Sequence, residues 1–197
     1  MIAYIEGEIT HKEPTHAILE TAGVGYYIRI SLNTFSAIKE IKGKCKLHTH
    51  LQIKEDAHSL FGFYELTEKK IFQELISVSG IGPGTAMVML SSMDAIGVQQ
   101  AIASEDVRTI QSIKGIGAKT AQRVILELKD KMKKDVLVSD SQQNTYTHNT
   151  KRNEALSALI TLGLAKNVAE KNLEVIVKKE GENITLEQLI KLALKMA

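Results

Sequence analysis

The sequence has one cysteine, two prolines and no tryptophan in 197 residues. A lone cysteine, Cys45, excludes an internal disulfide framework and is typical of a reducing compartment. Aromatic residues make up 5% of the chain, so there is little material for a surface on which bases would stack. No apolar run approaches the roughly 18 residues that a membrane span needs. These absences predict a cytoplasmic protein that does not enter a membrane.

Net charge is also nearly absent. The 25 Lys and Arg residues almost balance the 23 Asp and Glu residues, which leaves +2. Nucleic-acid binders usually carry a basic excess, so the total by itself argues against such a partner. The distribution is uneven, however, because residues 1–62 have seven basic and seven acidic side chains, whereas residues 114–134 have seven basic and two acidic ones. The average therefore hides a local basic segment of net +5.

The first 63 residues are predicted to form a small β-barrel. Alternation is clearest at 44–54, where one face has Cys45, Leu47, Thr49, Leu51 and Ile53 and the other has Lys46, His48, His50 and Gln52. Shorter β-rich runs cover residues 1–10, 16–21, 26–31 and 58–63, with a helical turn near 33–38. Five short strands with one helical turn favour a closed or Greek-key barrel.

From residue 64 to residue 137 the pattern is helical. We predict a first helix capped by Thr67 and a long helix from about Ala118 to Lys133. Between them, Ser92-Met93-Asp94 and Ser104-Glu105-Asp106 predict further caps, with acids in the first turn where the helix dipole favours them. Segment 138–150 is rich in Ser, Asp, Gln, Asn and Thr and is predicted to be a flexible linker.

Residues 151–197 are predicted to form three short helices. The first is stopped by Gly163, and Thr185 with Gln188 predicts a capping box at the start of the third. A segment of this size buries only a small core and is marginally stable by itself, which favours a module tethered to the rest of the chain.

The strongest signal is a repeat in the helical middle. Residues 75–86, LISVSGIGPGTA, are followed 35 positions later by residues 110–121, IQSIKGIGAKTA. Each copy predicts a helix, a Gly-Ile-Gly turn and a second helix that begins with small residues. Glycines permit the sharp turn, the isoleucine anchors it in the core, and the free N–H groups of the second helix suit an anion.

An alternative is that each Gly-Ile-Gly is a purely structural turn that joins two helices and binds nothing. The presence of two copies with matching flanks favours the anion-binding interpretation over this one. A nucleotide-binding loop is disfavoured, since Ala118 stands where a Walker A motif needs glycine before Lys119-Thr120. A Rossmann loop would need a preceding strand. Lys119 and Arg123, four positions apart, can project from one helix face and help to hold a phosphate.

Clusters with catalytic or metal-binding chemistry are not evident. Cys45, His48 and His50 have metal-ligand residue types, but strand alternation puts the cysteine on the opposite face. The adjacent acids Glu55 and Asp56 have no third ligand beside them, and by themselves they fit an ordinary hairpin turn. We therefore predict no catalytic residue and no bound metal.

Taken together, these features resemble the RuvA family of Holliday-junction branch-migration subunits. The resemblance covers essentially the whole chain and rests on the repeat and on four further motifs: Met1-Ile2, Gly23-Val24-Gly25-Tyr26, Lys54-Glu55-Asp56-Ala57 before Leu60-Phe61-Gly62-Phe63, and Ala158-Leu159-Ile160-Thr161-Leu162-Gly163. It implies an α+β multidomain protein with an OB-like barrel (1–63), a tandem helix-hairpin-helix domain (64–137), the linker (138–150) and a three-helix motor-binding domain (151–197).

The resemblance also implies functional residues. A homotetramer, alone or paired with a second one, would hold a four-way DNA junction, with the hairpins on the duplex arms and Glu55 and Asp56 as an acidic pin at its centre. The implied DNA-binding residues are Gly80, Gly82, Gly84, Thr85, Gly115, Gly117, Lys119, Thr120 and Arg123. Gly84 and Ala118 stand where family members often have lysine, so main-chain groups and Lys119 are expected to matter more here.

The partners implied by the resemblance are the hexameric ring ATPase RuvB and the junction resolvase RuvC. Leu159, Leu162 and Leu164 match the surface that contacts RuvB, although burial in the three-helix core is an equally good interpretation of Leu159. No cofactor is expected, since ATP is used by the motor. Two other functions stay open: a repair nuclease or glycosylase that docks through the same hairpins, and a helical adaptor that does not bind DNA.

Overall fold

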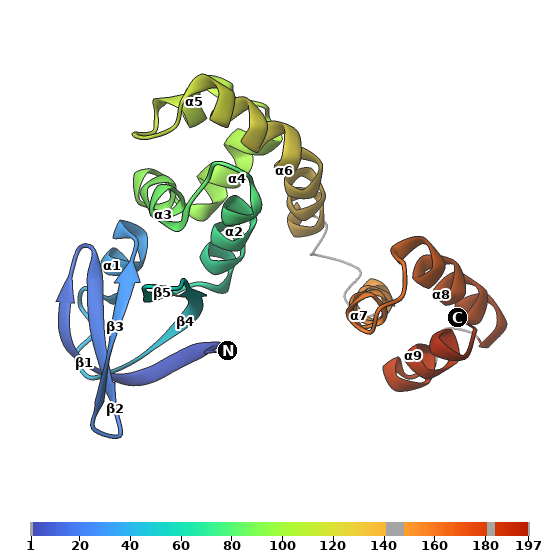
Figure 1. Ribbon diagram of the computed structural model, residues 1–197. Coiled ribbons are helices and arrows are strands. Elements are labelled where there is room, and N and C mark those ends of the chain that lie inside the picture. The colour runs from blue at the N-terminus through green and yellow to red at the C-terminus, as the bar shows by residue number, and fades with distance from the viewer. Residues whose placement is uncertain (1, 141–147, 181–183, 197) are drawn as a thin grey trace. The chain divides into compact units, whose positions relative to one another are not determined.

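The computed structural model describes residues 2–140, 148–180 and 184–196 (Figure 1). The chain divides into two compact units, Met1–Val136 and Leu137–Ala197. The first contains a barrel and a helical half, and the second is a small helical bundle.

The N-terminal half of the first unit is a closed barrel, as predicted. Its strands are β1 (Tyr4–Glu13), β2 (His16–Thr21), β3 (Val24–Ile30), β4 (Lys44–Ile53) and β5 (His58–Phe63), and α1 (Leu32–Ile38) follows β3. Neighbouring strands run in the order β1-β2-β3-β5-β4, and only β3 and β5 pair in parallel. The burial implied by the alternation in β4 is confirmed at Cys45, Leu47 and Thr49, but it does not reach the end of the strand, where Leu51 is half-buried and Ile53 is 65% exposed.

The barrel and the helical half are joined by a buried polar network. The hydroxyl groups of Ser31 and Thr34 donate hydrogen bonds to the two carboxylate oxygens of Glu68, which is 5% exposed. Each hydroxyl also accepts a backbone N–H, from Thr34 and Tyr64 respectively, so its proton is committed to the carboxylate. Burial raises the pKa of Glu68, although the two hydroxyl groups act in the opposite direction. This network fixes α1 against α2.

The helical half consists of α2 (Leu66–Ser77), α3 (Pro83–Ser92), α4 (Ala95–Ala103), α5 (Val107–Ser112) and α6 (Ala118–Asp140). They share one apolar core that includes Phe72, Leu75, Leu90, Ile102 and Leu128. The predicted cap segments of α4 and α5 are confirmed, since Asp94 and Asp106 accept hydrogen bonds from Gly97 N and Thr109 N. These two acids are the N-cap residues themselves and precede the first turn, in which they were predicted to lie.

Two predicted helix ends are wrong. The N-cap of α2 is Glu65 rather than Thr67: the helix begins at Leu66, two residues earlier than predicted, so that Thr67 and Glu68 both lie in its first turn. The long helix does not end near Lys133 but continues to Asp140, and no glycine or proline interrupts residues 118–140. Of the predicted linker, residues 138–140 continue α6, residues 148–150 open α7, and residues 141–147 lie outside the described residues.

The second unit contains α7 (His148–Thr161), α8 (Lys166–Glu180) and α9 (Leu186–Lys195). Its core is formed by Leu159, Leu173, Ile176 and Leu189 with three alanines. The predicted capping box is confirmed, because the Thr185 and Gln188 side chains each accept the backbone N–H of the other residue.

Among the described residues, no single helix has the length and apolar composition of a membrane span. The pair α3 and α4 meets that test only jointly, and the two are bent by 99°.

Candidate nucleic-acid interface

The two copies of the repeat fold into the same hairpin. In the first, Val78 N donates to Leu75 O and Ile81 N donates to Val78 O at 3.1 and 3.0 Å. In the second, the equivalent bonds run from Ile113 N to Ile110 O and from Ile116 N to Ile113 O, at 3.3 and 3.1 Å. The repeat in sequence is thus a repeat in main-chain hydrogen bonding.

Glycine is required for the turn at one position of each hairpin. Gly80 has a φ of +95° and Gly115 a φ of +91°, a region that a residue with a Cβ rarely adopts. The isoleucines between the glycines, Ile81 and Ile116, are 4% and 5% exposed and hold each turn against the core. The predicted anchoring role of isoleucine is therefore confirmed.

The other hairpin glycines are not required by the protein's own packing. A Cβ added at Gly82, Gly84 or Gly117 would meet no atom within 4 Å. By contrast, a Cβ at Gly62 in the barrel would lie 2.4 Å from a methyl group of Ile28. The hairpin surface is open at these three positions, so another molecule can approach the main chain closely.

The helices that leave the hairpins begin without a side-chain cap. Gly82 is the N-cap of α3, and no side chain bonds the first N–H groups of that helix. Gly117 holds the corresponding position before α6, where Ala121 N donates to Gly117 O at 2.9 Å, as Ala86 N does to Gly82 O at 3.0 Å. Side chains do cap α1, α4, α5 and α9. The N–H groups at both hairpins are therefore available to an external acceptor, with the positive end of a helix dipole behind them.

The basic segment 114–134 is less available than its net charge suggests. Lys129 and Lys133 pair with Glu105, and Lys131 pairs with Glu74. These contacts reach back across the helical half, so the three lysines contribute to packing between α6 and the rest of it.

Among the described side chains of this segment, two lysines stay available. Lys114 and Lys119 are exposed, and within the described part of the chain neither forms an ion pair. Both belong to the second hairpin.

The predicted site residues Thr85 and Thr120 are half-buried and occupy matching positions in α3 and α6.

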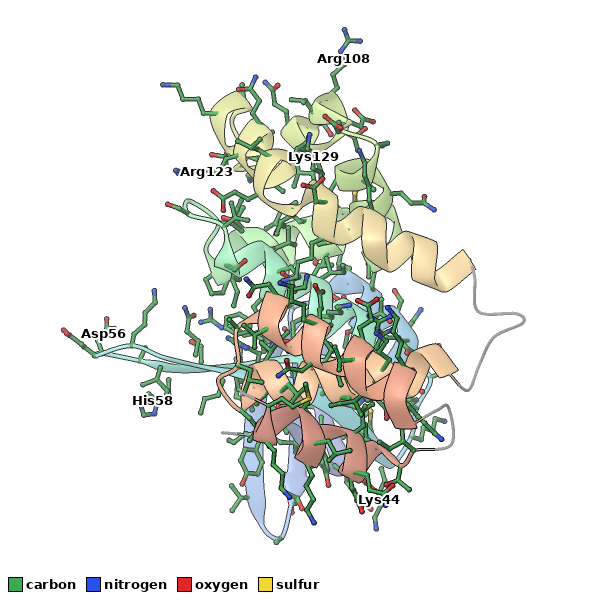
Figure 2. All side chains as sticks on the ribbon, turned by 90° about the vertical axis from the view of Figure 1, so that its right-hand side faces the viewer. Lys44, Asp56, His58, Arg108, Arg123 and Lys129 are labelled. Atoms are coloured by element: carbon green, nitrogen blue, oxygen red, sulfur yellow. The ribbon has the colours of Figure 1, made fainter. Side chains whose placement is uncertain are left out.

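Arg123 connects the two hairpins. Its Nε lies 3.1 Å from Glu127 Oε1, and its guanidinium donates to the carbonyl of Ser79 in the first hairpin, at 3.5 Å. A phosphate ligand would thus share this guanidinium with two acceptors of the protein. Figure 2 shows Arg123 projecting from the same side of the first unit as the tip of the β4–β5 hairpin.

Glu55 and Asp56 lie at that tip, in the turn closed by the bond from Lys54 N to Ala57 O. Both are exposed to solvent, and Figure 2 shows Asp56 far out from the barrel. The tip is thus a projecting point with two adjacent carboxylates, and its role as an acidic pin stays a prediction.

The leucines predicted to contact a partner differ in exposure. Leu159 is completely buried in the core of the second unit, which agrees with the core interpretation, whereas Leu162 is 60% exposed. Leu164 is half-buried, and its N–H donates to Leu159 O while Gly163 N donates to Ile160 O. This pair of bonds forms the Schellman motif that ends α7, and Leu164 packs back onto the core as such motifs require.

The Cys45, His48 and His50 combination does not converge on one point. Cys45 lies in the barrel core, where burial raises the pKa of its thiol. His50 instead packs edge-on against Phe72 of α2, with ring centroids 5.4 Å apart, and burial lowers its pKa. Strand alternation was therefore a reliable guide to this motif.

Sequence reasoning missed two features. Glu68 carries no local signal, because its partners lie more than 30 residues earlier in the chain. The second is a cluster of His11, Glu13 and His16 at the β1–β2 turn. Its signal was present as His-x-Glu-Pro-Thr-His, in which metal-ligand residue types flank a proline turn.

Comparison with known proteins covers the whole chain. Residues 1–62 match the RuvA N terminal domain, residues 72–130 a SAM-like helix-hairpin-helix tandem, and residues 150–196 the RuvA C-terminal domain. A protein of Cytophaga hutchinsonii named Holliday junction branch migration complex subunit RuvA is 62% identical, with all of both chains covered. Proteins of the same name from Christiangramia forsetii and Acetivibrio thermocellus are 52% and 41% identical, with 99% of this chain covered in each case. The chain belongs to the RuvA family.

Proposed function

We propose that this chain binds four-way DNA junctions by their shape and phosphate backbone, as a subunit of a branch-migration complex. The observation that carries the proposal is the glycine at the N-cap of both hairpin helices, in a chain that caps four other helices with side chains. Uncapped N–H groups bind phosphate oxygens and do not distinguish bases. The names of the relatives, which specify the Holliday junction, support the same substrate.

The proposal assigns separate roles to backbone and side chains. Main-chain N–H groups after Gly82 and Gly117 contact phosphates, and Lys119 adds a charge at the second hairpin. In a homotetramer, four copies of this pair of hairpins would meet four duplex arms. Glu55 and Asp56 would lie near the strand-exchange point, where their charges repel phosphates and keep the strands apart.

The second unit is proposed to recruit the ring ATPase RuvB, and the complex as a whole would also work beside the resolvase RuvC. Leu162, the most exposed of the three candidate leucines, offers apolar contact area, while Leu159 supports it from the core. In this scheme ATP is hydrolysed by the motor, and the chain itself is a non-catalytic subunit without a cofactor.

The substrate is tested by gel-shift titration of the full chain with a four-way junction, linear duplex and single strand of matched sequence, with competitor DNA present. We expect the junction to be bound most tightly. Equal affinity for junction and duplex would refute shape recognition. Strand cleavage or base release during the incubation would instead favour a nuclease or glycosylase.

The hairpin contact is tested by Lys119→Gln, with Lys44→Gln as the matched control. Both variants lose one positive charge, but Lys44 lies at the start of β4 in the barrel (Figure 2). Lys119→Gln should weaken junction binding and reduce the slope of log affinity against log salt by about one for each phosphate that is no longer neutralised. The two variants would have equal affinity if binding depended only on overall charge.

A further inference from the structure

The end of the β1–β2 hairpin brings together three side chains with metal-ligand atoms. Glu13 and His16 are direct cross-strand partners on either side of the Pro14-Thr15 turn. His11 lies two residues before Glu13 on the same strand, and residues two apart on a strand share a face. Register and alternation therefore place His11, Glu13 and His16 together.

The ligand atoms are already close. His11 Nε2 lies 3.1 Å from Glu13 Oε1, and His16 Nδ1 lies 3.8 Å from Glu13 Oε2. All three ligand atoms are within 4.8 Å of one another. Tetrahedral coordination at about 2.0–2.1 Å needs separations of roughly 3.4 Å, which the exposed His11 and Glu13 side chains can reach by rotation.

The least exposed ligand is held in place. The His16 side chain is 15% exposed, and its ring stacks on Tyr27 at a centroid distance of 4.6 Å and an interplanar angle of 21°. The turn itself is tied to β3, since Ile30 N donates to Thr15 O at 3.1 Å. Two of the three ligands thus flank a turn whose position the barrel fixes.

The neighbouring cations do not occupy the cluster. Lys12 lies on the alternate face, where its ammonium group donates to the carbonyls of Ile38 and Ile41. The guanidinium of Arg29, the cross-strand partner of His16, lies over the Phe61 ring at 6.0 Å. By comparison, the pKa of His48 on β4 is lowered by burial and, to a smaller extent, by the neighbouring cations Lys46 and Lys69.

We propose that His11, Glu13 and His16 form a binding site for a borderline divalent transition metal such as Zn²⁺, Co²⁺ or Ni²⁺. Two imidazoles and one carboxylate match the donors that these ions prefer, whereas Mg²⁺ and Ca²⁺ prefer oxygen ligands alone. Three protein ligands leave a coordination position for water or an external ligand. The site is independent of the proposed junction binding and goes beyond it.

The test is calorimetric titration of the full, tag-free chain with ZnCl₂ in a non-coordinating buffer. We expect one Zn²⁺ per chain, and binding weakened by about 100-fold in His11→Gln, Glu13→Gln and His16→Gln, since even an outer partner of a ligand is worth 10–100-fold. His48→Gln is the matched control and should bind as the wild type does. Equal affinities in all four variants, or no saturable binding by the wild type, would overturn the site.

A second measurement reports the position of the metal. With no tryptophan, the emission of the chain comes from its five tyrosines. Co²⁺ should quench the tyrosine stacked on His16, and Tyr27→Phe should remove most of that quenching while keeping one Zn²⁺ per chain. Quenching that persists unchanged in Tyr27→Phe would place the metal elsewhere. Unfolding curves without metal verify that each variant is folded.

Discussion

Replacing Gly82 by asparagine should change the stability of the first hairpin and its binding to the junction in opposite directions. Gly82 has a φ of −86° and a ψ of 166°, an extended conformation that suits an asparagine N-cap. An added Cβ would meet nothing within 4 Å, so the side chain fits without rearrangement. Its amide oxygen would then accept an N–H of the first turn of α3, which no side chain caps in the wild type.

Two opposite effects should follow. Asparagine is a better N-cap than glycine by a few tenths of a kcal/mol, so unfolding of the first unit should require slightly more urea or a temperature about 1–3 °C higher. Junction binding should weaken, because the new cap occupies an N–H that the phosphate would use. A hydrogen bond to a charged group contributes about 1.5–3 kcal/mol, which corresponds to a loss of roughly 10- to 100-fold in affinity for one such bond.

The assay pairs urea denaturation with gel-shift titration on the same preparations. Gly82→Asp is the companion variant, since it supplies the same cap with a negative charge and should bind the junction more weakly than Gly82→Asn. If Gly82→Asn were more stable and still bound the junction with wild-type affinity, the N–H groups of α3 would not be the phosphate contact, and the proposed role of the first hairpin would be refuted.

Three further perturbations test other parts of the first unit. Gly115→Ala should lower the free energy of unfolding by about 1–2 kcal/mol, because an alanine is strained at the φ of +91° that Gly115 adopts. An unchanged urea midpoint would show that the turn does not require this φ. Because burial raises the folded pKa of Glu68, the native state binds more protons than the unfolded state from about pH 4.5 upward, so wild-type stability falls as pH rises to the folded pKa. Glu68→Gln should lack that fall, and parallel pH profiles of the two proteins in urea unfolding would disprove this linkage. The double variant Glu55→Gln/Asp56→Asn, which neutralises the tip, should tighten junction binding in gel shifts and alter branch migration. The control Glu40→Gln should leave the affinity unchanged. If the control changed the affinity as much as the double variant does, local repulsion at the tip would be ruled out.

Local patterns in the sequence predicted much of this structure. Strand alternation identified the buried residues in the first part of β4. The cap segments at 92–94 and 104–106 and the Thr185 capping box were predictable because each cap is set by residues within one helical turn. The repeat predicted both hairpins, because the turn depends on a few adjacent glycines and one isoleucine.

Features that depend on long-range contact were not predictable in this way. Glu68 accepts hydrogen bonds from Ser31 and Thr34, which lie 37 and 34 residues earlier, and no local rule contains such a contact. The lysines of α6 contribute to the basic character of segment 114–134, yet Lys131 pairs with Glu74, 57 residues earlier. The candidate site could thus be located from the sequence. The sequence could not show which lysines of segment 114–134 are available to a ligand and which are paired with acidic side chains of the protein.

The two hairpins share a main-chain geometry but differ in charge, and this difference has a consequence for binding. Residues 75–86 contain no charged side chain, whereas residues 110–121 contain Lys114 and Lys119. Salt weakens DNA binding mainly through the counterions that lysine and arginine displace, so the salt dependence should come from the second hairpin. Contacts from the N–H groups of the first hairpin displace few counterions. The neutral variant Gly82→Asn should therefore lower affinity by a similar factor at every salt concentration, while Lys119→Gln should lower it most at low salt.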